Sequence, residues 1–264
     1  MNLLKNQIAY FTSGNKNNIP IIFIHGFPFD HEMWRHQVSY LREKFFCVTY
    51  DIRGLGNSAP GDGQFTIDMF ADDLEDLIDE LDLVKPIICG LSMGGYIALR
   101  AVERFENKFS ALILCDTKSA ADNDEAKLKR AAGIKTINSD GAEKFVRDFV
   151  TGCFSPKTIK NKPEVFIEIL NRSLTNNPTG LKGCLLAMAA RTDTTSYLAK
   201  IKIPVLLICG EDDTLTPPEV MKGMSEQIPN SEFVLIPQAG HLTPVENPEK
   251  VNMALKKFLG RNIS

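Results

Sequence analysis

The stretch PIICGLSMGGYIALRAVERF, residues 86–105, passes from an apolar run through a glycine-rich turn into a segment with helical spacing. Ser92 lies at the turn, with a glycine two residues away on each side. A serine at a sharp strand-to-helix turn has a strained backbone, and small neighbours leave room for the chain segments that come close. The pattern predicts that Ser92 presents its hydroxyl at the end of a buried strand, where it acts as a nucleophile.

Five more apolar runs have the length of strands and are rich in Ile, Val and Phe: residues 19–25, 45–51, 110–116, 204–210 and 232–237. Their side chains are apolar almost without interruption, which is typical of parallel strands covered on both faces. Helical patterns lie between them, such as the apolar stripe from Ile67 to Leu81 behind the capping residue Thr66. This alternation predicts an α/β fold with a mostly parallel, doubly wound sheet.

Residues 117–200 interrupt the alternation, because they contain helical patterns and no strand-like run. One apolar stripe spans residues 145–150, and two more follow Pro163 and Pro178, in keeping with the frequency of proline in the first turn of a helix. We therefore expect a core domain of residues 1–116 and 201–264, with a helical lid of residues 117–200 inserted between two strands. Ligands bind at the carboxyl edge of such sheets, so the lid is expected to cover that edge.

The composition is that of a soluble globular chain, since 44% of the 264 residues are hydrophobic and 24% are charged. A formal charge of −3 gives no electrostatic reason to expect nucleic acid or an anionic membrane as a partner. No apolar run is long enough to span a bilayer, and the N-terminal residues lack the apolar region of a signal peptide.

The six cysteines show no CxxC pair and no metal-ligand spacing. Four of them, at positions 47, 89, 115 and 209, fall inside the strand-like runs, where cysteine behaves as a small buried hydrophobe. Free buried thiols are typical of a reducing compartment. We therefore expect a cytoplasmic protein without disulfides and without a metal site.

The charge is unevenly distributed along the chain. Residues 117–200 contain 14 Lys and Arg against 9 Asp and Glu, whereas the remaining residues contain 16 against 24. The predicted lid is therefore basic and the predicted core domain acidic, which favours an anionic or electron-rich substrate.

A serine hydroxyl is a poor nucleophile unaided, so a base and an orienting acid are expected downstream of Ser92. Of the four histidines, only His241 follows the serine; His25, His31 and His36 precede it. His241 lies in a loop just after the strand-like run 232–237, where it could reach the serine. We expect His241 to be the base and His25, at the end of a strand, to be structural.

For the acid, Asp213 is the preferred candidate, because it lies in the loop after the strand-like run 204–210, in a turn closed by two prolines. Glu211 and Asp212 are neighbouring alternatives in the same loop. Asp116, after the run 110–116, is a second possible location for the acid.

An oxyanion formed during acyl transfer needs two amide donors. One is expected from Met93, the residue after the nucleophile. The other is expected from the loop after the run 19–25, where Pro28 has no N–H and Phe27 is the natural donor.

Five ordered motifs give the chain a family resemblance: HGFPFDHEMW (25–34), DIRGLGNS (51–58), CGLSMGGYIAL (89–99), GEDDTLTPP (210–218) and QAGHLTPVENPE (238–249). Together they cover essentially the whole chain, which resembles the α/β-hydrolases and in particular bacterial serine esterases and 3-oxoadipate enol-lactonase-like enzymes. The resemblance implies the α/β-hydrolase fold and puts the acid three residues past the glycine, at Asp213. Leu55 departs from the family, which often has histidine there, and Arg53 is expected to fix its loop.

The resemblance implies a serine esterase that cleaves a small-molecule ester or lactone through a covalent acyl-enzyme and needs no metal or organic cofactor. An enol-lactone hydrolase, a carbon–carbon bond hydrolase, a cofactor-free haloperoxidase or perhydrolase, and a ligand-sensing protein on the same fold remain alternatives. The oligomeric state is left open between monomer and homodimer.

The lactonase branch implies an anionic substrate, and Arg191 is the candidate that would bind it. The alternative for Arg191 is an arginine that bonds the last carbonyls of a helix. Phe145 and Met188 in the predicted lid are candidates for an acyl pocket, although at helical spacing such residues also form the core of a lid.

Overall fold

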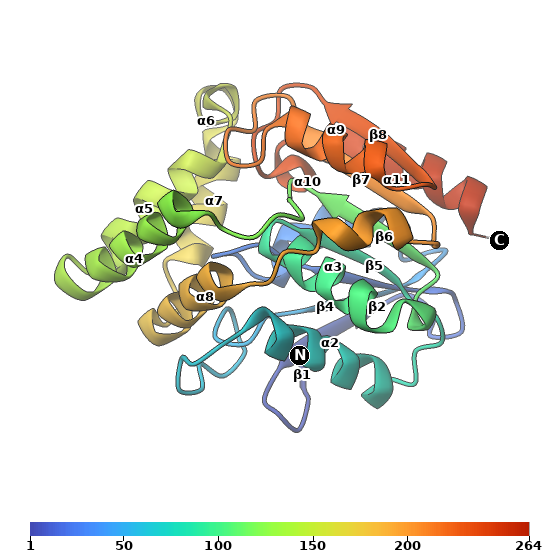
Figure 1. Cartoon of the computed structure of the whole chain (residues 1–264), viewed down its shortest axis with the longest axis horizontal. Coiled ribbons are helices and arrows are strands. Elements are labelled where there is room, and N and C mark those ends of the chain that lie inside the picture. Colours follow the sequence, from blue (N-terminus) through green and yellow to red (C-terminus); the bar gives the residue numbers. More distant parts are fainter. Residues whose placement is uncertain (264) are drawn as a thin grey trace.

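The computed structural model describes residues 1–263, which form an eight-stranded sheet in the order β1-β2-β4-β3-β5-β6-β7-β8 (Figure 1). The strands from β3 onward pair in parallel, whereas β1 and β2 are antiparallel to their neighbours. Their bounds are Asn2–Leu3, Ala9–Ser13, Pro20–Ile24, Phe46–Tyr50, Ile87–Leu91, Ala111–Cys115, Val205–Gly210 and Ser231–Ile236. The mostly parallel doubly wound sheet is confirmed.

All six strands predicted from apolar runs are present as β3 to β8. Every residue of β5, β6 and β7 is buried, since helices cover both faces of the sheet. The four cysteines of the strand-like runs lie in β4, β5, β6 and β7, and all six cysteines are buried free thiols.

The antiparallel strands β1 and β2 were not predicted. β2 lies near the edge of the sheet, and its residues are mostly half-buried, so its sequence AYFTS carries no continuous apolar run. Its partner β4 supplies the hydrogen bonds that such a segment needs, and this pairing joins residues about 40 positions apart, between Tyr10 and Tyr50 for example.

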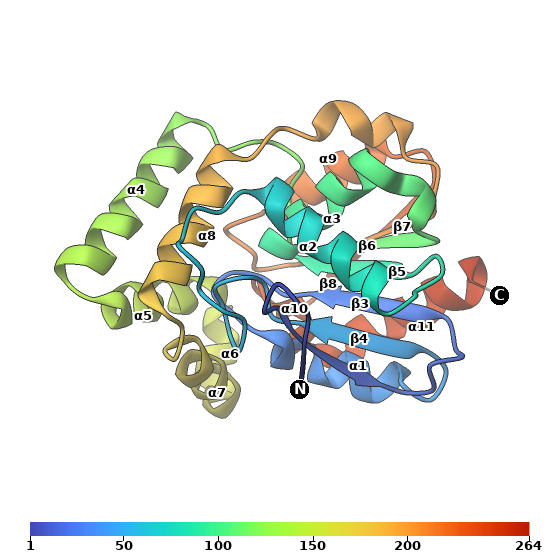
Figure 2. The same ribbon diagram turned by 90° about the horizontal axis from the view of Figure 1, so that it is seen from below.

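Two layers of helices enclose the sheet (Figure 2). α2 and α3 pack against each other on one face, and α1 and α11 pack against each other on the other. Thr66 caps α2 as predicted, by accepting a hydrogen bond from the Met69 amide. The helices outside the insertion are His31–Trp34 (η1), Arg35–Leu41 (α1), Ile67–Glu80 (α2), Met93–Phe105 (α3), Glu106–Lys108 (η2), Pro218–Gln227 (α9), Thr243–Glu246 (α10) and Pro248–Asn262 (α11). The short helix η3 (Thr195–Lys200) ends the segment between β6 and β7.

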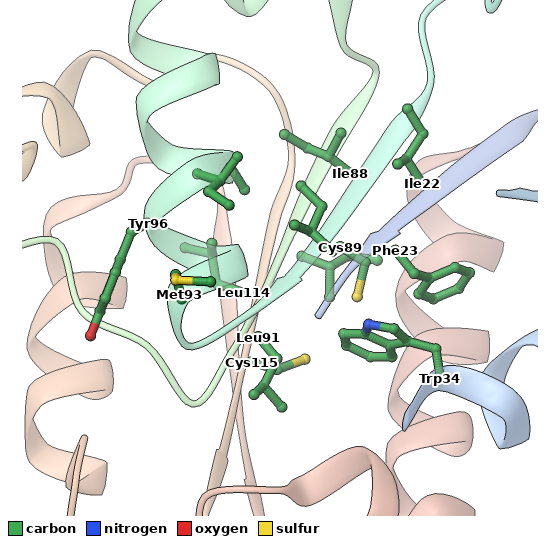
Figure 3. Packing of buried hydrophobic residues seen from close by; sticks show 14 of the residues in the cluster. Ile22, Phe23, Trp34, Ile88, Cys89, Leu91, Met93, Tyr96, Leu114 and Cys115 are labelled. Carbon is green, nitrogen blue, oxygen red and sulfur yellow. The ribbon is translucent and has the colours of Figure 1, made fainter. Parts of the chain in front are cut away.

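The core between the sheet and the helices is built from large side chains (Figure 3). Phe23 of β3 packs against Trp34, with ring centroids 5.2 Å apart, and both are fully buried. On the other face, the glycines at the start of α3 let that helix approach the sheet, since a Cβ on Gly94 would collide with the carbonyl oxygen of Ile24. This close approach brings the N-terminus of α3 to the carboxyl ends of β3 and β5.

A helical insertion lies between β6 and β7, as predicted, and stands at one end of the sheet (Figure 1). It contains α4 (Asp124–Ser139), α5 (Ala142–Cys153), α6 (Pro156–Asn161), α7 (Pro163–Ser173) and α8 (Pro178–Ala190). The three predicted apolar stripes lie on α5, α7 and α8. α4 and α6 were missed: α4 buries only Gly133 and Ile137, and α6 is short. The division into a core domain and a lid domain at residues 116 and 200 stays a prediction.

The insertion contacts the core through backbone as well as side chains. Gly180 of α8 lies against Gly54, so closely that a Cβ on residue 180 would collide with the Gly54 carbonyl oxygen. Arg172 of α7 forms an ion pair with Asp30, at 2.7 Å. The insertion is therefore seated on the loops that follow β3 and β4.

Within residues 1–263, none of the helices combines the length and the apolar character that crossing a bilayer requires.

Gly180→Ala is expected to destabilise the protein by about 1–3 kcal/mol, because the added methyl group meets backbone that cannot rotate away. Thermal unfolding should show a lower Tm, at about 2–4 °C per kcal/mol for a chain of similar length. Gly223→Ala is the control: its Cβ has open space within α9, so it should stabilise the protein by about 0.4–1 kcal/mol. Equal Tm values for the two variants would contradict the packing described for α8.

Candidate active site

Ser92 follows β5 directly and precedes α3. Its φ of 52° and ψ of −113° lie in a region that side-chain-bearing residues rarely adopt, which identifies a strained turn. The glycines of the motif explain why the turn is possible, because a Cβ on Gly90 would collide with the carbonyl oxygen of Gly94. The turn is further held by the amide of Ser92, which donates to the carbonyl of Cys115 at 3.0 Å.

The structure brings Ser92, His241 and Asp213 into one hydrogen-bonded chain. His241 Nε2 lies 2.8 Å from Ser92 Oγ, and His241 Nδ1 lies 2.9 Å from Asp213 Oδ2. His241 and Asp213 are buried, with 3% and 4% of their surface exposed. The three residues lie 149 and 28 positions apart along the chain, and they meet because β5, β7 and β8 end at the same edge of the sheet.

Asp213 is held by its own loop. Its Oδ1 accepts hydrogen bonds from the amides of Leu215 and Thr216, at 2.8 and 3.1 Å, and its Oδ2 also accepts from the Thr216 hydroxyl at 2.7 Å. Three donors from the protein therefore orient the carboxylate toward the imidazole.

The alternative acids have other partners. Glu211 accepts from the Gln238 amide at 3.3 Å, and Asp212 accepts from the Ser155 hydroxyl at 2.7 Å. Asp116 accepts from the amide of Gly210 at 2.9 Å and from the hydroxyl of Thr243 at 2.5 Å. Asp116 thus ties together the two loops that carry Asp213 and His241, without contacting the imidazole itself.

The electrostatics of the site favour the protonated form of His241 and the ionised form of Asp213. Burial lowers the pKa of His241, but the charge and hydrogen bond of Asp213 outweigh it, so the pKa lies above its ordinary value of 6.5. Burial raises the pKa of Asp213, but His241 and the Thr216 donors outweigh it, so that pKa is lowered. Burial and the neighbouring charge of Asp213 raise the pKa of Asp116 to about 8.

The loop that carries His241 is attached to the insertion. The His241 amide donates to the carbonyl of Cys153, at the end of α5, at 2.8 Å. Glu246 accepts from the amides of Gly240 and Ser155, at 2.8 and 2.9 Å, and so joins the histidine loop to the α5–α6 junction. The insertion therefore helps to hold the imidazole in place.

The two expected oxyanion donors flank Ser92. Met93 is the first residue of α3, and Phe27 lies in the loop after β3, next to the nucleophile turn, since a Cβ on the adjacent Gly26 would lie 3.3 Å from the Cβ of Ser92. Within residues 1–263, neither amide has an intramolecular acceptor, so both are free to bind an anion. The geometry fits the expected role of both residues.

A cavity of about 470 Å³ opens at Ser92 and His241. One wall is apolar and comes mainly from the insertion, with Phe145, Leu185 and Met188 among its residues. Phe27 continues this wall, since its ring lies 5.3 Å from that of Phe149 and 6.1 Å from that of Phe145. The structure therefore brings the candidates Phe145 and Met188 to the cavity.

Arg191 does not line this cavity, in contrast to the expectation that it binds the substrate. Its guanidinium donates to Asp122 at 2.7 Å and to the carbonyls of Met188 and Ala120, and it stacks over Tyr96, 4.1 Å from the ring centroid. Arg191 therefore bonds one of the last carbonyls of α8, that of Met188, in keeping with the alternative role. The physical reason is that Asp122, buried beside it, takes up its charge.

Lys118 and Arg130, which were missed, line the cavity instead. Arg130 Nε lies 3.1 Å and Lys118 Nζ 3.6 Å from the carboxylate of Asp122, so one buried anion faces three cations. Burial, and next the charges of Arg191 and Arg130, lower the pKa of Lys118. The one sequence signal for this cluster was the basic character of residues 117–200.

One buried group in the described chain has side chains of metal-ligand type: Asp116, Cys209 and Asp213, whose ligand atoms lie within 4.8 Å of one another. The carboxylates already accept the hydrogen bonds given above, and the Cys209 thiol points at the carbonyls of Gly210 and Thr216. Because the two carboxylates accept hydrogen bonds from the surrounding loops, the cluster is explained as a structural link between those loops. Oxygen atoms engaged in this way do not fit a metal site.

Two residues expected to be structural have structural contacts. His25 is fully buried, donates through Nδ1 to the Gly26 carbonyl and accepts the Ile52 amide at Nε2, each at 2.8 Å. Arg53 pairs with Asp73 of α2. Leu55, the departure from the family motif, is buried in the core.

Comparison with known proteins agrees with this architecture. The family model described as alpha/beta hydrolase fold matches residues 19–248. A thermophilic esterase from Thermogutta terrifontis, solved with malate bound, has a TM-score of 0.93 and 35% identity and covers 97% of this chain and 94% of its own. The 3-oxoadipate enol-lactonase 2 of Acinetobacter baylyi is 28% identical over 254 residues, 96% of this chain and 93% of the enol-lactonase. A bromoperoxidase from Bacillus anthracis has a TM-score of 0.86 and 26% identity, covering 96% and 95%.

Asp213→Asn is expected to lower the pKa of His241, because it removes the largest of the carboxylate contributions that oppose burial. NMR titration of the imidazole C–H signals measures both values. His36 is the internal control: burial and Arg35 lower its pKa, and it should titrate alike in both proteins. A His241 pKa that does not change on substitution would contradict the charged pair.

Proposed function

The chain belongs to the α/β-hydrolase fold family, and from this premise we propose that it is a serine hydrolase that cleaves carboxylic esters or lactones of small molecules. The observation that carries the proposal is the hydrogen-bonded chain Ser92–His241–Asp213 at the floor of a cavity. The catalytic roles below are part of the proposal.

In the first step Ser92 Oγ attacks the carbonyl carbon while His241 Nε2 accepts its proton. The negative charge that develops on the carbonyl oxygen is bound by the amides of Phe27 and Met93. Asp213 holds the imidazole in the tautomer whose Nε2 is free and stabilises the imidazolium cation that forms.

The tetrahedral intermediate collapses when His241 returns its proton to the leaving alkoxide, which leaves the acyl group on Ser92. Water then enters, gives a proton to His241 and attacks the acyl carbon. The second intermediate collapses with cleavage of the bond to Ser92 Oγ, which takes the proton back from His241, and the acid is released. For a lactone the two products are one molecule, so the leaving hydroxyl stays attached to the acyl group.

We further propose that the substrate carries a carboxylate. Lys118 and Arg130 offer more positive charge than Asp122 neutralises, and they face the cavity. The chain at Lys118 lies close to the nucleophile turn, because the neighbouring Thr117 donates its hydroxyl to the Ser92 carbonyl at 2.8 Å. The apolar wall of the same cavity would take the hydrocarbon part of the molecule.

The relatives support this class of substrate. The enol-lactonase of Acinetobacter baylyi acts on a lactone of 3-oxoadipate by its name, and the Thermogutta esterase was solved with malate, a dicarboxylate.

The remaining charged pair at the cavity does not cancel this positive charge. Glu125 and Lys129, which are exposed, pair with each other and are neutral together, so the excess charge of Lys118 and Arg130 remains.

Ser92→Ala is expected to lower kcat for p-nitrophenyl butyrate by about 10⁴-fold or more, because the covalent step is lost. A fluorophosphonate probe should label the wild-type protein and leave this variant unlabelled. Hydrolysis at the wild-type rate by Ser92→Ala would sink the proposal. Binding of esters by the wild-type protein without turnover would favour a ligand-sensing role instead.

Arg130→Gln is expected to lower kcat/KM for a p-nitrophenyl half-ester of glutaric acid at least about 10-fold more than for p-nitrophenyl butyrate, because a charge-assisted contact is lost. The ratio of the two kcat/KM values measures the preference for a carboxylate. Lys127→Gln is the matched control, since Lys127 lies on the same helix, pairs with Asp124 and does not line the cavity. An unchanged ratio in Arg130→Gln would refute the carboxylate while leaving ester hydrolysis intact.

A further inference from the structure

The loop that carries the Phe27 amide, residues 26–30, is held from outside by the helical insertion. Within the loop, the Phe29 amide donates to the Gly26 carbonyl at 2.9 Å. The remaining support includes α5, through the rings of Phe145 and Phe149, and α7, through the ion pair of Arg172 with Asp30. Each of these contacts acts at an end of the loop or on the ring of Phe27.

Asn176, in the turn between α7 and α8, contacts the backbone beside Phe27. Its Nδ2 donates to the carbonyl of Pro28 at 2.7 Å and to that of Ser173 at 3.0 Å. Its Oδ1 accepts the amide of Gly56 at 2.9 Å. The side chain is buried, with 8% of the residue exposed, so none of these bonds is easily exchanged for water.

These three bonds join three separate segments: the loop after β3, the loop after β4 and the insertion. One amide group spans them because it offers two donors and an acceptor in one plane. Aspartate would have the same shape, but it would put a negative oxygen against the carbonyl of Pro28. Alanine would leave that carbonyl and the Gly56 amide without partners.

The position of the Phe27 amide decides how much an oxyanion hole contributes. A donor must lie about 2.7–3.1 Å from the developing oxyanion, and a shift of about 1 Å in a catalytic group can cost about 100-fold in rate. The carbonyl of Pro28 belongs to the residue directly after Phe27, so the bond to Asn176 limits the movement of the donor.

We propose that Asn176 is a positioning residue for the oxyanion hole: by holding the Pro28 carbonyl, it keeps the Phe27 amide aimed at the reacting carbonyl oxygen. The inference rests on the proposed serine-hydrolase function. It gives the insertion a second role besides lining the cavity, since part of the catalytic geometry is then set by residues outside the sheet and its loops.

The experiment compares Asn176→Asp and Asn176→Ala with the wild-type protein. Both variants should lower kcat for p-nitrophenyl butyrate by about 10- to 100-fold with little change in KM, because the oxyanion forms only after binding. A boronic acid that adds to Ser92 as a tetrahedral mimic should bind more weakly by a similar factor. Butyl p-nitrophenyl ether, a neutral analogue without a carbonyl oxygen, should inhibit all the proteins with the same affinity.

Asn177→Ala is the matched control. Asn177 is the neighbouring residue and caps α8 by accepting the Thr179 amide at 2.8 Å, without reaching the loop of residues 26–30. This variant should lower Tm and leave both kcat and boronic-acid affinity within about twofold of the wild type. It separates loss of stability from loss of oxyanion geometry.

Two results would overturn the proposal. In the first, both Asn176 variants keep the wild-type kcat and boronic-acid affinity. In the second, the boronic acid and the butyl p-nitrophenyl ether lose affinity by the same factor, which would indicate a general change of the cavity. A wild-type protein that does not hydrolyse esters would instead refute the proposed function, so the two failures are distinguishable. The isosteric Asn176→Asp keeps the test valid if the alanine variant does not fold.

Discussion

The strained backbone at Ser92 is the constraint on which the rest of the active site depends. With φ at 52°, the chain reverses from β5 into α3 within one residue, which leaves the hydroxyl at the edge of the sheet and the first amides of the helix beside it. Such a conformation persists only where its surroundings fix it. Here they do: Gly90 and Gly94 allow the close packing, and bonds to Cys115 and Thr117 hold the turn from β6 and the segment after it.

The insertion is a structural part of the site as well as its cover. The insertion bonds the histidine loop through the Cys153 carbonyl and through the Ser155 amide, which donates to Glu246. It also bonds the loop after β3 through Asn176 and Arg172, and Gly180 packs on Gly54. A segment attached at so many points cannot swing open as a unit without breaking buried hydrogen bonds.

The charges of the site are arranged in two separate groups. At the triad, the carboxylate of Asp213 is hydrogen-bonded to the imidazole of His241 and favours its cation. In the second group, Lys118, Arg130 and Arg191 surround Asp122 and leave an excess of positive charge, and of these cations Lys118 and Arg130 line the cavity. A substrate with an ester at one end and a carboxylate a few bonds away would match both groups, and the low polarity of the aromatic wall would strengthen each interaction.

Local patterns in the sequence determined several features of this protein. Continuous apolar runs predicted the six parallel strands, and their absence from residues 117–200 predicted the helical insertion. The glycine spacing predicted the turn at Ser92, and the order along the chain singled out His241 as the candidate base. Asp213 was preferred on its place in a loop, but only the fold excluded contact of Asp116 with the imidazole. The roles of Lys118, Arg130, Arg191 and Asn176 were decided by tertiary structure alone. Their partners lie as many as 148 positions away, and a cation or an amide is assigned a role by the buried group it meets, which no local pattern encodes.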